Sequence, residues 1–397
     1  MSDYNFLNGI KIAEFHMLKA YPSSALNRDD VGEQKTAYYN GYLRNRISSQ
    51  CIKRAYRMSD TFTEAIGDKG IRTRLMPEIV GERLIKDHGV DPECATLFKL
   101  LLAGEELGKD SKKGKKSKNQ ERAENGSSVQ SPAIAFYTED ELCHITEICK
   151  NIYDGLKEPK CDDLRNRKGD EIKNELAKKK TRLTVDVAAF GRMVTDNMLK
   201  EVEGAMQFSH VLSTNSAMKE SDYFIACDDF VNGESEDSGA AMLGEIDYNS
   251  SCYYIHAVAD LEQFAKNLDG NDNMEEMVKS LPSGFAEVMS YTDPAARQNT
   301  FEAHVLPEVL YIELKTKKRP LNRMKAFMEP CNKDVIKTSV NALANNITTV
   351  NAKADLAISH ALWYCEDEGE GFVIPEGVTV VHSLPELQQK LDEWMNL

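Results

Sequence analysis

Hydrophobic positions recur with two different periods along the chain. Alternation of apolar and polar residues predicts strands at 10–18, 42–47, 252–257, 309–314 and 378–381. Helical spacing predicts helices at 78–86, 92–107, 139–156, 261–268, 273–291, 334–364 and 385–395. Strands and helices divided in this way are typical of an α+β protein with a ferredoxin-like core. The RNA-recognition fold belongs to that class, although its aromatic RNP strings are not visible in this sequence.

The period changes abruptly at Ser48 and Ser49, and the change gathers basic residues. A strand at 42–47 places Tyr42, Arg44 and Arg46 on one face. Either serine is a suitable N-cap for the helix that follows. The basic face of that helix consists of Gln50, Lys53, Arg54 and Arg57, and the opposite stripe, expected to face the core, consists of Cys51, Ala55, Met58 and Phe62.

Basic side chains at the start of a helix indicate an anionic ligand. A helix N-terminus already carries roughly half a positive charge, so cations in its first two turns need a counter-charge. No acidic residue stands four positions after any member of the basic face. Free backbone N–H groups, two hydroxyls and basic side chains together form a phosphate site. The alternative is an ordinary solvated basic face.

The loop from Leu26 to Asp30 is a second candidate contact. Arg28 can bind a phosphate through two parallel hydrogen bonds. Asp29 and Asp30 can either hold that arginine or cap local N–H groups. A turn made of Asn and Asp residues that binds nothing is the alternative.

Composition changes between about 61 and 184 and indicates an inserted helical lobe. Residues 108–131 are rich in Lys, Ser, Asn and Gln and contain almost no apolar residue, which predicts a disordered surface loop. The lysines at 109–122 either touch nucleic acid or are simply solvated. A second basic run, Lys178, Lys179 and Lys180, ends a predicted helix.

Two later segments carry candidate contacts for bases. Gly191 lets the backbone approach a ligand closely, and an exposed Met193 can wedge between bases. Farther on, two apolar stretches flank an acidic, glycine-containing tip, which predicts a hairpin that either belongs to the core or projects from it. The apolar residues of its strands include Tyr223, Phe224, Met242 and Leu243.

Length, charge and cysteine content narrow the class of protein. At 397 residues with 41% hydrophobic residues, the chain can build two or three lobes. No stretch approaches the roughly 18 apolar residues of a membrane span and residues 1–9 lack a signal-peptide pattern, so we expect a cytoplasmic protein without a membrane partner. The nine cysteines form no C-x-x-C pair, which favours reduced, mostly buried thiols. A net charge of −15 argues against a simple nucleic-acid coat, but residues 1–57 are basic.

Common catalytic and cofactor motifs are absent from the sequence, so we expect neither a catalytic residue nor a cofactor. His16 and His210 are expected to be core histidines. Cys143, His144 and Cys149 come nearest to a metal cluster but lack a partner pair to complete a tetrahedron, so no metal is expected. The enzymatic alternative is a metal-dependent RNase that uses a loop aspartate, Asp29 or Asp30.

Several sequence blocks, in order, carry a family resemblance. The blocks are Leu26-Asn27-Arg28-Asp29-Asp30, Gln34-Lys35, Arg46-Ile47-Ser48-Ser49-Gln50, Lys53-Arg54-Ala55, Gly191-Arg192-Met193, Val202-Glu203-Gly204-Ala205-Met206 with Ser209-His210, Asp228-Asp229, Pro294-Ala295-Ala296-Arg297-Gln298-Asn299-Thr300 and Pro320-Leu321-Asn322. Together they closely resemble the crRNA-binding backbone subunit, CasC, of the type I-E CRISPR Cascade complex. The resemblance runs from about residue 8 to the C-terminus and is weak between about 66 and 184.

The resemblance implies a fold and a set of contacts. The expected fold is a modified RRM-like palm at 1–65, 185–215 and 251–397, with a helical fingers insertion at 66–184 and a projecting thumb hairpin at 216–250. Lys178, Lys179 and Lys180 would contact target DNA. Tyr223, Phe224, Met242 and Leu243 would form the thumb wedge. The expected RNA contacts are Asn27, Arg28, Lys35, Arg44, Arg46, Ser48, Ser49, Gln50, Lys53, Arg54, Arg57 and Met193.

The function implied is that of a noncatalytic scaffold. Such a protein polymerises along a CRISPR RNA, contacts sugar and phosphate, and presents the guide for pairing with target DNA in antiviral defence. Its partners would be CRISPR RNA, target DNA through that RNA, further copies of itself and other Cascade subunits. A third class, a self-assembling protein whose basic patch meets an acidic neighbour, stays open.

Overall fold

The computed structural model describes residues 4–105, 107, 117–165, 172, 174–175, 181–194, 199–226, 242–367 and 369–396. The chain forms two compact units, which we call the sheet unit (1–66, 206–265 and 275–397) and the helical unit (67–205 and 266–274). The predicted second palm segment, 185–215, is divided between them, because its residues 185–205 belong to the helical unit.

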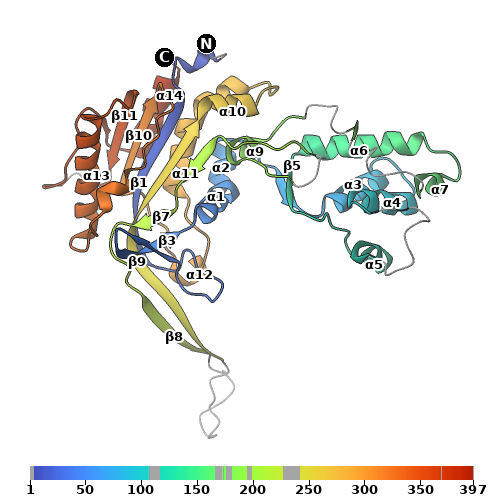
Figure 1. Ribbon diagram of the computed structural model, residues 1–397, viewed down its shortest axis with the longest axis horizontal. Helices are drawn as coiled ribbons and strands as arrows, with labels where there is room; N and C mark the ends of the chain where they lie inside the picture. Colours follow the sequence, from blue (N-terminus) through green and yellow to red (C-terminus); the bar gives the residue numbers. More distant parts are fainter. Residues whose placement is uncertain are drawn as a thin grey trace, which may run out of the picture. The chain divides into compact units, whose positions relative to one another are not determined.

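The sheet unit contains the long strands and the longest helices (Figure 1). Its strands are β1 (Ile12–Ser24), β2 (Thr36–Tyr39), β3 (Tyr42–Ile47), β6 (Met206–Phe208), β7 (Val211–Ser213), β8 (Glu220–Ala226), β9 (Met242–Asp260), β10 (Val309–Lys315), β11 (Ile358–Cys365) and β12 (Thr379–Val381). Its helices are η1 (Asn5–Leu7), α1 (Ser49–Met58), α2 (Asp60–Ala65), α12 (Gln298–Phe301), η2 (Arg323–Phe327), α13 (Val335–Asn351) and α14 (Leu384–Met395), and α10 (Leu261–Asn267) and α11 (Met274–Tyr291) lie mostly in it.

One large sheet organises this unit. The strand order is β12-β11-β10-β1-β9-β7-β3-β2, and β6 and β8 also pair with β9. The β11–β12 pair is parallel, whereas β1 pairs antiparallel with both β9 and β10. This mostly antiparallel sheet with its covering helices confirms the α+β class.

Both faces of the central strands are buried, because helices cover each face. Phe15 of β1 packs edge to face against Phe285 of α11, with ring centroids 5.3 Å apart. On the opposite face Leu18 and Tyr311 belong to a cluster with Leu343 and Ile347 of α13. Eight consecutive residues from Ile12 are therefore buried, and strict polar alternation disappears.

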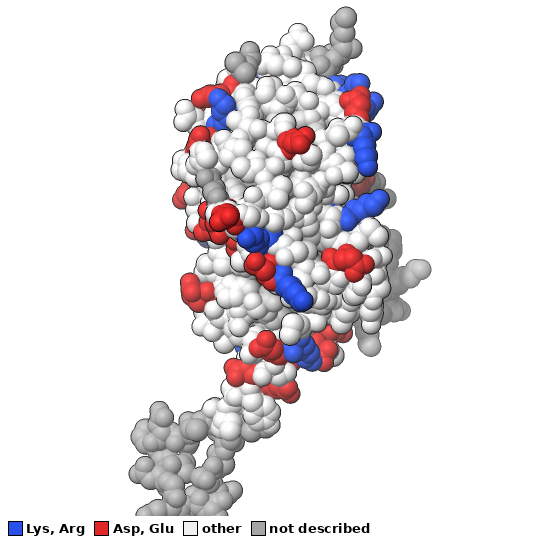
Figure 2. All heavy atoms as spheres, turned by 90° about the vertical axis from the view of Figure 1, so that its left-hand side faces the viewer, with Lys and Arg blue, Asp and Glu red and all other residues white. Residues whose placement is uncertain are grey.

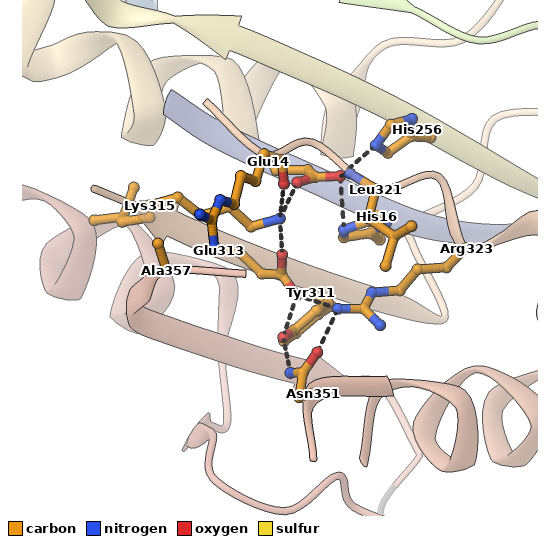
Figure 3. Close-up of polar contacts among 12 residues, drawn as sticks. Glu14, His16, His256, Tyr311, Glu313, Lys315, Leu321, Arg323, Asn351 and Ala357 are labelled. Atoms are coloured by element: carbon orange, nitrogen blue, oxygen red, sulfur yellow. Dashed lines mark hydrogen bonds and ion pairs between the residues drawn. The ribbon is translucent and has the colours of Figure 1, made fainter. Parts of the chain in front are cut away.

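A buried polar network crosses β1, β9 and β10 under residues 319–323 (Figure 3). Glu14 Oε1 accepts hydrogen bonds from His256 Nε2 (2.8 Å) and from the backbone N–H of Leu321 (2.7 Å). Lys315 Nζ bridges Glu14 and Glu313, and Glu313 also binds Arg323. Two carboxylates thus balance two cations inside the fold, as buried charges require.

The same network surrounds His16. His16 is fully buried, as predicted, and its Nδ1 lies 2.7 Å from the Tyr254 hydroxyl. Burial, and then the nearby charges of His256, Arg323 and Lys315, lower the pKa of His16 well below its usual value. Glu14, His16 and His256 could ligate a cation together on the side of Glu14 Oε1, whereas the Lys315 ammonium binds Glu14 Oε2.

The helical unit contains β4 (Ile71–Thr73), α3 (Met76–Lys86), α4 (Pro92–Leu102), α5 (Lys118–Glu124), β5 (Ala135–Tyr137), α6 (Glu139–Asp154), α7 (Lys160–Arg165) and α9 (Val185–Phe190). Its core gathers Val80 and Leu84 of α3 with Phe98 of α4 and Leu142 and Ile145 of α6. β4 and β5 form a separate antiparallel ribbon.

Two expectations about secondary structure were wrong. Residues 334–364 do not form one helix: α13 ends at Asn351, and after a left-handed Ala357 (φ 55°) the aromatic run enters β11. Part of the predicted disordered loop, 117–131, is ordered, because Ser117 caps α5 in a capping box and Val129 is buried. Residues 108–116 of that loop lie outside the described residues.

The expectation of reduced thiols was wrong for one pair. Cys94 of α4 and Cys161 of α7 form a disulfide between residues 67 positions apart in sequence. Of the other described cysteines, Cys143 is exposed and Cys51 is partly buried, while the rest are buried.

Candidate nucleic-acid interface

Three segments of the sheet unit meet at Ser48, where β3 passes into α1. Ser48 is the N-cap, as predicted, and its hydroxyl accepts a hydrogen bond from the N–H of Cys51 (3.3 Å). The Ser48 N–H donates to Asn27 Oδ1 (2.9 Å). The Asn27 side chain therefore holds the 25–35 loop against the start of the helix.

Asp29 organises the turn of that loop. Its Oδ1 accepts hydrogen bonds from the N–H groups of Val31 (3.1 Å) and Glu33 (2.9 Å). Arg28 and Gln34 form a backbone bridge across the turn. Of the two roles predicted for Asp29, the structure thus shows the capping of local N–H groups.

Backbone pairing brings Lys35 beside Arg46. The Lys35 N–H donates to Asn27 O (3.1 Å), and Lys35 O accepts from the Arg46 N–H (2.8 Å). The Cys51 thiol lies near two of these cations. Burial raises the pKa of Cys51, and the positive charges of Lys35 and Arg54 partly offset this rise. Loop, strand and helix therefore contribute cations to one neighbourhood.

The basic face of α1 is oriented outward, and the predicted core stripe was only partly right: Phe62 is fully buried, but Cys51 and Ala55 are only partly buried. Ile52 and Tyr56 are the buried residues of the helix, and Met58 is 49% exposed. Tyr56 packs against Phe285 with ring centroids 5.7 Å apart. Gln50 and Arg54 are exposed, and Ser49, Lys53 and Arg57 are partly exposed.

Lys53 has a defined position on this face. Its ammonium lies 5.4 Å from the centroid of the Phe208 ring, and burial lowers its pKa. Phe208 of β6 was not identified from the sequence, because it lies far from Lys53 along the chain and is brought near it by the folding of the sheet unit.

Arg44 was wrongly assigned to the RNA contacts. It is fully buried and donates to the carbonyl oxygens of Ser213 (3.2 Å), Thr214 and Phe327 (2.8 Å). Burial lowers its pKa from the usual value. Arg44 therefore joins β3 to β7 and η2 and has no surface for a ligand.

His210 corrects another expectation, because it is exposed and not in the core. Its Nδ1 lies 3.5 Å from Arg46 Nη1, so the imidazole lies beside the basic surface. Ser209-His210 belongs to one of the family blocks, but the apolar segment around it favoured a core position for His210.

The basic cluster, defined as Arg28, Lys35, Arg46, Lys53 and Arg54, has no internal counter-charge. Within the described part of the chain, none of these five residues forms an ion pair with a carboxylate. Other surface cations do: Lys318 Nζ lies 2.6 Å from Asp260 and 3.3 Å from Glu262. An unpaired cluster in a chain of net charge −15 is suited to an anionic ligand.

The face of the sheet unit at α13 carries few charged side chains among the described residues. α13 holds a single charged residue, Lys337, in its 17 positions. In Figure 2, which views the molecule from that side, charges of both signs are scattered among uncharged side chains.

The predicted hairpin exists: β8 pairs antiparallel with β9, with Phe224 opposite Gly244. Its paired strands extend beyond the rest of the sheet (Figure 1). Tyr223 is 62% exposed and Ile225 is 54% exposed. The Phe224 ring lies over Gly244, where an added Cβ would come within 2.3 Å of it. Met242 and Leu243 pair in the ladder, and their side chains lie outside the described residues.

Met193 lies in the helical unit and is 81% exposed. The residue before it is anchored: buried Arg192 binds Glu141 (2.8 Å) and donates to Phe136 O (3.0 Å) and Lys200 O. Gly191 has a φ of 81° and approaches Gly204 closely, which excludes a side chain there. Lys178, Lys179 and Lys180 lie outside the described residues.

The described residues offer two possible groups of three metal ligands, and neither contains Asp29 or Asp30. One Asp29 oxygen already accepts two backbone hydrogen bonds, while Asp30 is exposed. Cys143, His144 and Cys149 do not form a ligand group in this part of the chain either.

The fold and the site define a class: an α+β protein with an unpaired cationic cluster beside a helix N-terminus. A family model described as CT1975-like protein (Cas_CT1975) matches residues 13–382. The chain belongs to this family.

Solved structures agree with this assignment. A chain of a "CRISPR RNA-guided surveillance complex, pre-nicking" superimposes with a TM-score of 0.76 at 23% identity, covering 96% of this chain and 99% of that one. A chain of a "CRISPR RNA-guided surveillance complex" gives 0.66 at 21% identity, covering 96% and 99%. At such identities these likenesses show the fold. With the family match they confirm the resemblance recognised in the sequence.

The comparison with curated proteins found no match. Among the described helices, none has the length and apolar character that a membrane span needs.

Proposed function

We propose that this chain is a noncatalytic subunit of a type I-E CRISPR surveillance complex that binds CRISPR RNA. In this proposal it is the backbone subunit, which polymerises along the spacer and presents the guide for pairing with target DNA in antiviral defence. The observation that carries the proposal is the basic cluster without carboxylate partners in a member of the CT1975-like family.

Recognition would go through sugar and phosphate. The cluster consists of flexible cationic side chains around Ser48, and such groups neutralise phosphates without selecting a base. A subunit repeated along a variable spacer needs contacts of this kind. The sheet unit would serve as the modified RRM-like palm and the helical unit as the fingers.

The β8–β9 hairpin supplies the proposed thumb. Tyr223 presents an exposed aromatic ring for contact with RNA on a neighbouring copy, and Phe224 stiffens the hairpin over Gly244. Met193 would provide a wedge from the helical unit, and Lys178, Lys179 and Lys180 would provide contacts to target DNA. Other Cascade subunits would complete the particle.

The test measures binding of a labelled spacer-length RNA across a salt series, with two unrelated guide sequences. Lys53→Ala and Arg54→Ala should each weaken binding equally for both guides. Each should flatten the slope of log affinity against log salt by about 0.7, the value for one lost phosphate contact on a single strand. Lys390→Ala is the charge-matched control, because Lys390 lies on α14 in an ion pair with Glu393.

Unchanged slopes for both cluster variants would contradict phosphate binding at this site, and losses that depend on the guide would indicate base recognition. The enzymatic alternative is tested by incubating the RNA-loaded protein with labelled complementary RNA and Mg²⁺ or Mn²⁺. Cleavage that disappears in Asp29→Ala or Asp30→Ala would make the protein a nuclease.

A further inference from the structure

The disulfide of the helical unit joins two elements of unequal anchorage. Cys94 lies in the first turn of α4, whose N-cap is Asp91, and belongs to the unit's core. Cys161 lies in the six-residue helix α7. The two Cα atoms are 5.2 Å apart. Among the described residues, α7 is also held by the buried Leu164, by an ion pair between Arg165 and Glu93 (2.6 Å) and by a hydrogen bond from the Lys157 N–H to Asp163 (3.1 Å).

The two sulfurs differ in their access to solvent. Cys94 is 1% exposed, whereas Cys161 is partly exposed. Lys160, next to Cys161, lies with its ammonium 4.2 Å from the Tyr153 ring centroid and adds a positive charge at the surface. Of the two residues, Cys161 is therefore the more accessible to an external thiolate.

The two sulfurs also differ in how well they carry negative charge. Cys94 occupies the third position of α4, where the helix N-terminus stabilises a thiolate. The Asp91 carboxylate lies 3.8 Å from Cys161 Sγ and within 4.8 Å of Cys94 Sγ, so it disfavours a negative charge at both sulfurs and the helix N-terminus alone favours Cys94. When the bond is attacked at Cys161, Cys94 is therefore the favoured leaving group.

We propose that Cys94 and Cys161 form a reversible thiol–disulfide site that fastens α7 to α4 when oxidised and frees it when reduced by a low-molecular-weight thiol. A small thiolate attacks Cys161 Sγ, the S–S bond breaks, and its electron pair leaves on Cys94, which then takes a proton. A second small thiolate attacks the mixed disulfide and releases Cys161 as a thiol. The products are two protein thiols and one oxidised small-molecule disulfide.

This assignment goes beyond RNA binding and does not depend on it. Cys143 is an exposed cysteine of the same unit that forms no disulfide, so Cys143→Ser serves as the matched control for Cys161→Ser. A covalent link across 67 residues restricts the chain strongly, so its loss affects α7 first.

The experiment equilibrates the full-length protein in glutathione buffers of increasing oxidised fraction. The protein is then unfolded in acidic denaturant, which stops thiol exchange, and its free thiols are alkylated and counted by mass. Reduced protein should carry the label on all nine cysteines and oxidised protein on two fewer, with the residues 94 and 161 linked in a peptide digest. Hydrogen exchange at 156–165 should be faster in the reduced protein and unchanged in α14.

Variants separate the outcomes. Cys161→Ser should remove the dependence on the buffer and show the fast exchange in every buffer, whereas Cys143→Ser should keep the loss of two labels. Because Cys161 is partly exposed, this variant avoids the folding defect that a change at buried Cys94 risks. Nine labels in every buffer, or a bond that glutathione does not reduce, would overturn the proposal. Zn²⁺ that protects both cysteines of the reduced protein would do so as well, in favour of a metal site.

Discussion

Replacing Arg44 separates the structural cation of the interface from those proposed to bind RNA. In Arg44→Met the side chain keeps much of its length but loses its hydrogen bonds to the carbonyl oxygens of Ser213, Thr214 and Phe327. Hydrogen bonds from a charged donor contribute roughly 1.5–3 kcal/mol each and are not additive, so we expect a loss of about 3–5 kcal/mol in unfolding free energy. The folded fraction should bind RNA with an unchanged salt slope.

Lys53→Met is the matched change with the opposite expectation. Lys53 is partly exposed and has no carboxylate partner among the described residues, so its unfolding free energy should change by no more than about 0.5 kcal/mol. Its salt slope should flatten. Arg44→Met should therefore change the unfolding free energy and leave the salt slope unchanged, whereas Lys53→Met should do the reverse.

Urea denaturation followed by tryptophan fluorescence measures the unfolding free energy of the sheet unit, to which Arg44 belongs. The protein has two tryptophans, Trp363 in β11 and Trp394 in α14, and both belong to the sheet unit. A stable Arg44→Met protein with a flattened salt slope would refute the assignment of Arg44 to the fold, because it would show a cation that meets RNA and not carbonyl groups.

Two further predictions concern the same unit. Burial and two nearby carboxylates raise the pKa of Glu308 to about 7, so its contribution to stability, complete below its ordinary pKa of 4.5, is lost as pH rises through 7. Glu308→Gln should therefore be more stable than the parent at pH 8, by up to about 1 kcal/mol after solvent screening, with no difference in urea midpoint at pH 4.5. The control variant, Glu64→Gln at an exposed position, should show no difference at either pH. An equal gain for Glu308→Gln at both pH values would contradict the argument. Asn27→Ala should lower the unfolding free energy by about 1 kcal/mol because it removes the acceptor for the Ser48 N–H. Asn27→Asp keeps that acceptor and should restore the urea midpoint. Equal midpoints for Asn27→Ala and the parent would show that this hydrogen bond does not stabilise the fold.

Local pattern accounts for the elements that build the candidate site. Ser48 as N-cap and the outward basic face of α1 follow from residues within four positions of one another, and the structure contains both. The predicted core stripe was right at Phe62 but wrong at Met58, which is exposed, and it omitted Ile52 and Tyr56, which are buried. A helix with large residues on several sides buries the ones that meet its neighbours, here Phe285, and a helical period alone does not choose among them.

Three features depended on contacts between distant parts of the chain. Arg44 donates to carbonyl groups about 170 and 283 positions away, His210 reaches the surface beside Arg46, and Cys94 meets Cys161. None of these partners stands near the other in sequence. No periodic signal therefore points to any of them.

The sequence by itself determined the α+β composition, the family and the cationic stretch around Ser48, because each is written in short blocks and local spacing. Only the tertiary structure decided which cations remain for a ligand. Strand pairing and helix packing turned Arg44 inward to satisfy buried carbonyl groups and left Lys35, Arg46 and Lys53 without carboxylate partners in the described chain. Whether a charge is structural or available depends on its neighbours in space, and a one-dimensional pattern does not contain them.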